Sequence, residues 1–143
     1  MRRVLSLASI CYLIVSVWGA VIALERVMPH SLFGGGSDDS IERDAWIGWG
    51  TALSPPAVGL AVVLLAAIVA GYGASRGWAG FLVVLVVAGL AHALYQDVVR
   101  DTLGDLGTDT VLSTLVAVQL SSALLVALLG TGIALGDRVS RPA

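Results

Sequence analysis

The sequence has little of what a water-soluble or disulfide-bonded protein needs. Charged residues make up 13% of its 143 residues, lysine is absent, and hydrophobic residues make up 57%. An average soluble domain has about 25% charged residues, so this composition excludes an ordinary soluble fold. The high apolar content also excludes intrinsic disorder, and glycine does not recur with the triplet period of collagen.

Cysteine is nearly absent as well. The single cysteine, Cys11, excludes an intramolecular disulfide and a thiol relay, because both need a second cysteine. Cys11 follows the large Ile10 within an apolar stretch, which argues against a lipidated N-terminus. We therefore expect Cys11 to have a packing role.

Four long stretches contain no Asp, Glu or Arg, namely residues 4–24, 57–74, 78–95 and 111–135. A helix needs about 20 mostly apolar residues to cross about 30 Å of hydrocarbon. Each stretch is apolar all round, and none alternates as the strands of a membrane β-barrel do. The sequence therefore predicts an all-α membrane protein: one domain, residues 1–143, in which four transmembrane helices form an antiparallel bundle.

The arginines predict the orientation of this bundle. The first apolar stretch is longer than the core of a cleavable signal, so we expect a retained helix. The side holding both termini then has five arginines and one acidic residue, Asp137, against three arginines and nine acidic residues on the other side. Basic residues favour the cytoplasmic side, so we predict a multi-pass protein of a plasma membrane with both termini in the cytoplasm.

The long outer connection, residues 25–56, has two parts. Residues 31–40 are rich in glycine and aspartate and predict a flexible turn region. Apolar residues then recur at helical spacing, which predicts a short amphipathic helix over about residues 40–53, lying flat in the outer interface with Trp46 and Trp49 at headgroup depth. Ser54 is expected to cap the next helix, with Pro55 at its first position.

Small residues spaced by four predict where helices approach each other. Lipid offers no hydrophobic drive for helix association, so close backbone contact between small residues supplies part of the attraction. The sequence offers three such sets: Ala67 with Gly71, Gly132 with Gly136, and Ser113 with Ala117 and Ser121.

Polar side chains within the apolar stretches are candidates for function, because they are expensive in a membrane. His92 and Gln96 lie on one face of the third stretch, and Gln119 and Ser122 lie in the outer half of the fourth. These four residues predict a polar pocket or ligand site in the outer half of the bundle. The alternative, which we favour, is that they form hydrogen bonds between helices and fix the bundle.

Several classes of chemistry find no support. No pair of His, Cys, Asp or Glu has metal-ligand spacing, His30 is the only other histidine, and catalytic motifs are absent, so we expect no metal, no cofactor and no catalytic residue. No carboxylate lies inside an apolar stretch, which disfavours an ion-coupled exporter. The arginines are scattered as topology alone requires, so nucleic-acid binding is not expected.

The sequence thus favours a non-enzymatic accessory or scaffold subunit in the lipid bilayer, in contact with a membrane-protein partner through Trp46 and Trp49. The first alternative is a homo-oligomeric transporter or channel protomer with a polar path at His92, Gln96 and Gln119. The second alternative is a membrane enzyme or cofactor binder. No family resemblance supports one of the three.

Overall fold

The computed structural model of the chain describes residues 2–26, 38–48, 50–72, 76–100 and 110–135, with the side chains of all but 38–40, 76 and 92–100. Its helices are α1 (Arg2–Glu25), α2 (Asp38–Trp46), α3 (Ala57–Gly71), α4 (Arg76–Arg100) and α6 (Thr110–Leu135). The part of the chain described contains no strand, and the predicted all-helical fold is confirmed.

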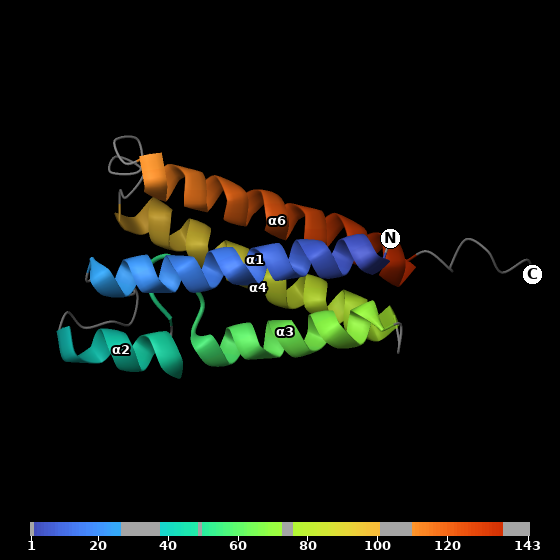
Figure 1. Cartoon of the computed structure of the whole chain (residues 1–143), viewed down its shortest axis with the longest axis horizontal. Helices are drawn as coiled ribbons and strands as arrows, with labels where there is room; N and C mark the ends of the chain where they lie inside the picture. The colour runs from blue at the N-terminus through green and yellow to red at the C-terminus, as the bar shows by residue number, and fades with distance from the viewer. Residues whose placement is uncertain (1, 27–37, 49, 73–75, 101–109, 136–143) are drawn as a thin grey trace, which may run out of the picture.

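The four long helices form a ring of neighbours. Helix α1 contacts α3 and α6, and α4 contacts the same two helices from the opposite corner. Successive long helices run in opposite directions, so that α1 begins and α6 ends at the same end of the molecule (Figure 1). Short connections favour such an up-and-down order, because each helix then packs against its neighbour in sequence.

Two of these helices, α1 and α6, are long and apolar enough to cross a membrane. The other two apolar segments are shorter within the residues described: α3 has 15 residues, and the apolar part of α4 covers Gly77–Ala91. At 1.5 Å per residue, α3 is about 22 Å long, against about 30 Å for the hydrocarbon of a bilayer.

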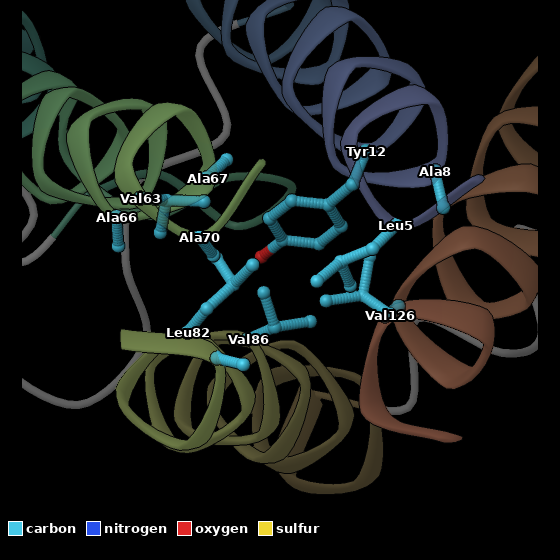
Figure 2. Close-up of a cluster of buried hydrophobic side chains, with 12 residues drawn as sticks. Leu5, Ala8, Tyr12, Val63, Ala66, Ala67, Ala70, Leu82, Val86 and Val126 are labelled. Carbon is cyan, nitrogen blue, oxygen red and sulfur yellow. The ribbon is translucent and has the colours of Figure 1, made fainter. Parts of the chain in front are cut away.

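The main core lies where the four long helices meet, and Tyr12 lies in it. The ring of Tyr12 extends from α1 toward α3 and α4, among the side chains of Ala70, Leu82 and Val86 (Figure 2). Its hydroxyl lies so close to Gly89 that a Cβ there would be 2.6 Å away. Helix α3 contributes three alanines to this core, Ala66, Ala67 and Ala70, and these small side chains allow the helix to approach its neighbours closely.

A second, smaller core closes the end of the bundle where α3 begins. Leu53 packs there with Ile22 and Ala23 of α1 and with Leu112 and Leu115 of α6. Leu53 belongs to a tight turn in which the Thr51 amide donates to the Ser54 carbonyl at 2.9 Å. The turn is buried and extends the packed part of the chain beyond the first residue of α3.

The predicted helix over residues 40–53 is shorter in the structure, because α2 ends at Trp46. Gly50 has a φ of +89°, a left-handed conformation that glycine adopts readily and that cannot continue a helix. The predicted cap is also wrong. Pro56 is the N-cap of α3, without a side-chain cap, and the Ser54 hydroxyl donates to the Pro55 carbonyl at 2.9 Å.

Helix α2 does not lie across the end of the bundle. It is drawn along the long axis of the molecule, in line with the beginning of α3 (Figure 1), and it contacts α1 and α3. Ile41 and Ala45, two of the apolar residues that recur at helical spacing in this segment, are buried. One face of α2 is therefore packed against the bundle, and the position of this helix in a membrane interface stays a prediction.

Two predictions about packing were wrong as well. Cys11 is exposed, because it lies off the buried face of α1, which includes Ala8, Tyr12 and Ser16. The set of Ser113, Ala117 and Ser121 is exposed on α6. The buried face of α6 consists instead of Leu112, Leu115, Gln119, Ser122, Ala123, Val126 and Gly130.

Candidate functional site

The candidate site is a line of buried polar side chains in the seam between α1 and α6. Ser9 and Ser16 of α1 are fully buried, and Gln119 and Ser122 of α6 are nearly so. Ser9, Tyr12 and Ser16 are spaced by three and four residues, which places them on one helical face. Packing of this face against its neighbours brings the polar groups into the interior.

Gln119 links the two helices directly. Its Nε2 donates to the Ser16 Oγ at 3.1 Å, and only 5% of the Gln119 residue is exposed. The Ser16 side chain also lies beside Tyr12, so three polar side chains on two helices are in contact. In a low-dielectric interior such a connected set stabilises one relative position of the helices.

The other serines of the seam are satisfied within their own helices. The Ser122 hydroxyl lies 2.8 Å from the Val118 carbonyl and 3.0 Å from the Gln119 carbonyl, and only 6% of this residue is exposed. The Ser9 hydroxyl donates to the Leu5 carbonyl at 2.8 Å. Back-bonding to the preceding turn is a common way for a buried serine to satisfy its hydroxyl, and it requires no ligand.

The remaining predicted pocket residues lie on α4. His92 and Gln96 belong to the C-terminal part of this helix, and their side chains lie outside the described residues. The pocket that would join them to Gln119 therefore stays a prediction. What the structure brings together is Gln119, Ser16 and Tyr12, an arrangement suited to holding helices in place.

The predicted interface residues lie apart from this seam. Trp46 ends α2 and is 66% exposed, beside the equally exposed Ile47. Trp49 lies outside the described residues. Trp46 and Ile47 thus form an exposed apolar patch at the end of α2, near the beginning of α3.

Sequence reasoning missed Ser16 and Tyr12, although a signal for both was present. They are four residues apart in an apolar stretch and therefore share a helical face with Ser9. The spacing of polar residues on α1 could have paired this face with the one that holds Gln119 and Ser122.

Among the side chains described, no three metal-ligating residues gather where they could hold one ion. Comparison of the chain with known proteins identifies no relative. No protein-family model, no curated protein and no solved structure matches the chain.

Proposed function

We propose that this chain is an integral membrane protein of a plasma membrane in which all four long helices cross the bilayer, and that it serves as a non-enzymatic accessory or scaffold subunit. The observation that carries the proposal is the apolar outer surface of the helix ring. Every long helix exposes large apolar side chains, among them Leu7 of α1 at 66%, Leu65 of α3, Val84 of α4 at 64% and Leu128 of α6.

The distribution of polar and apolar residues is the reverse of that in a water-soluble helix bundle. A helix in a soluble bundle turns one apolar stripe inward and polar residues outward. Here the polar residues Ser9, Ser16 and Gln119 are inside, while valine, leucine and isoleucine cover the outside. Exposed apolar patches of this extent mark a surface that another apolar phase or protein covers, and for helices apolar all round that phase is lipid.

The short helix α3 is compatible with a crossing because of the turn before it. Residues 51–54 are buried, Leu53 packs against α1 and α6, the Thr51 amide donates to the Ser54 carbonyl, and the Leu53 amide donates to the Thr51 hydroxyl. Non-helical backbone at membrane depth is tolerated when it is buried in protein. The turn and α3 together therefore give a longer packed segment for crossing the bilayer than the 15 residues of α3 alone.

The charges support an orientation with both ends in the cytoplasm. Arg2 and Arg3 lie at the end where α1 begins and α6 finishes, whereas Glu25, Glu42 and Asp44 lie around the opposite end. The sequence has five arginines on the side with both termini and three on the α2 side, and arginine favours the cytoplasmic side of a membrane, so we propose that the α2 end faces outside.

The role as a subunit rests on the surface at that outer end. Trp46 and Ile47 are exposed outside the helix ring, on a segment with the charged residues Glu42, Arg43 and Asp44. Tryptophan is enriched at the centres of protein interfaces, where it buries a large area at a small entropic cost. We expect a partner membrane protein to cover this surface.

Purification in a mild detergent tests the proposal. The wild-type chain is expected to retain one partner in constant proportion, and Trp46→Ala is expected to weaken that retention by at least tenfold, because a tryptophan at the centre of an interface contributes about 2 kcal/mol or more. Trp18→Ala is the matched control, since Trp18 is also exposed but lies on α1, inside the apolar belt.

Two results would contradict the subunit role. The first is equal partner retention by the Trp46 and Trp18 variants. The second is a homo-oligomer without any partner whose transport activity in proteoliposomes is lost on His92→Ala, a result that would establish the transporter alternative.

A further inference from the structure

A continuous groove runs along the outside of the bundle between α1 and α3. Two hollows of about 330 and 490 Å³ lie between these helices, and both are lined by Ile10 and Leu64, so that one continues into the other. The first extends to Ser6, Gly71 and Tyr72, and the second extends to Trp18, Val21 and Leu60.

The groove is apolar along most of its length and polar at one end only. From Ser6 to Val21 it follows α1 for about 22 Å at 1.5 Å per residue, which exceeds the about 15 Å of hydrocarbon in one leaflet. Its walls are leucine, isoleucine, valine and alanine, with Trp18 toward the far end and with Ser6, Gly71 and Tyr72 at the first end. Such a channel fits an acyl chain that enters from one face of the membrane.

Positive charge gathers at the polar end. The Arg2 guanidinium donates from Nη1 to the Ala70 carbonyl at 3.2 Å, which holds it against the last turn of α3 beside the groove. Arg3 is exposed and lies three residues before Ser6 and seven before Ile10, on the α1 face that lines the groove. A guanidinium has five donors, so Arg2 retains donors for a second acceptor.

We propose that this groove binds one anionic phospholipid, with its phosphate at Arg2 and Arg3 and an acyl chain along α1 and α3. Charge complementarity selects the occupant. A transmembrane helix of a partner would bury two arginines without bringing a compensating charge, whereas a lipid phosphate accepts paired hydrogen bonds from guanidinium groups. The inference rests on the proposed location in the membrane.

Native mass spectrometry of the full-length protein in a neutral detergent tests the site. The probes are a phosphatidylglycerol and a phosphatidylcholine with the same acyl chains. Each basic residue near an anionic lipid surface contributes about 1 kcal/mol, which corresponds to about fivefold. Wild-type protein is therefore expected to retain phosphatidylglycerol at least tenfold more than phosphatidylcholine.

Two kinds of variant distinguish the contribution of the arginine charge to lipid binding from that of the apolar groove. Arg3→Gln is expected to lower the preference for phosphatidylglycerol about fivefold while keeping the Arg2–Ala70 bond, and Arg3→Lys is expected to retain most of it. Ala61→Trp fills the groove and is expected to reduce retention of both lipids. The controls are Arg43→Gln on α2 and Ala88→Trp on the outer face of α4, which are expected to behave as wild type.

Three results would overturn the lipid site: equal retention of the two lipids by wild type, an unchanged preference in Arg3→Gln, or displacement of the lipid by soluble glycerol phosphate. A co-purified protein released by Ala61→Trp without any change in lipid retention would assign the groove to a partner instead. Recovery of the chain from cells without detergent would contradict the membrane location itself. This result distinguishes a failure of the proposed membrane location from a failure of the lipid site alone.

Discussion

At the scale of single residues, the bond between Gln119 and Ser16 fixes the relation of α1 and α6 most directly. Gln119 and Ser16 meet at 3.1 Å, and theirs is the side-chain hydrogen bond that joins the two helices across the seam, whereas Ser9 and Ser122 bond within their own helices. Removing one of them leaves the other as a buried polar group, which costs more than the bond contributes. A double-mutant cycle separates these two quantities.

The cycle uses Gln119→Leu and Ser16→Ala, with the unfolding free energy measured in detergent micelles. We expect a coupling of about 0.6 kcal/mol, with about 1.7 kcal/mol as the upper end, as for hydrogen bonds between other membrane helices. Ser121→Ala is the control, because Ser121 is exposed and its hydroxyl donates to the Ala117 carbonyl of its own helix. Strictly additive single effects would mean that the two side chains do not interact.

At the scale of elements, the contact between α4 and α6 depends on a missing side chain. A Cβ on Gly130 of α6 would overlap the Cγ2 of Val83 and lie 3.2 Å from the Ala79 carbonyl. A Cβ on Gly80 of α4 would meet the Cβ of Ala134 at an ordinary 3.8 Å. These two glycines lie in the same pair of helices, but only the first allows a close approach.

We therefore expect Gly130→Ala to destabilise the bundle by about 1–3 kcal/mol through overpacking. Gly80→Ala is expected to be neutral or stabilising, since alanine is the better helix former by about 1 kcal/mol. The unfolding free energy in detergent measures both. Equal effects of the two substitutions would contradict the close approach at Gly130.

The bounds of some helices can be predicted from the sequence pattern, whereas the bounds and position of others depend on packing. Runs without charge locate α1, α3, α4 and α6 to within a few residues, because their apolar character is set by composition. The end of α2 depends on the φ of Gly50, and the position of α2 depends on Ile41 and Ala45 meeting α1 and α3. Neither is visible in the spacing of residues.

The candidate site shows the same division. Gln119 and Ser122 were predictable as rare polar residues in an apolar stretch. The spacing of Ser9, Tyr12 and Ser16 marked a polar face on α1, but the specific pairing of Ser16 with Gln119 follows from the rotation of α1 against α6, which the sequence does not contain. For the same reason the exposed face of Ser113 and Ser121 was mistaken for a contact face.

At the scale of the whole molecule, the apolar exterior and the buried polar seam between α1 and α6 have the same physical cause. In the membrane location that we propose, lipid solvates the outer valines and leucines, and the interior then needs close packing and hydrogen bonds to hold the helices together. α1 and α6 are long enough to cross a membrane by themselves. The proposed four-helix crossing requires that α3 and α4 cross the bilayer beside them.

Accessibility of single cysteines in opened membranes tests that claim most directly. In a Cys11→Ser background, Leu64→Cys on α3 and Val84→Cys on α4 are compared with Glu42→Cys on α2, all exposed positions. A membrane-impermeant maleimide is expected to label position 42 rapidly, and to label positions 64 and 84 only after denaturation in SDS. Labelling of positions 64 and 84 at the rate of position 42 would contradict four crossings.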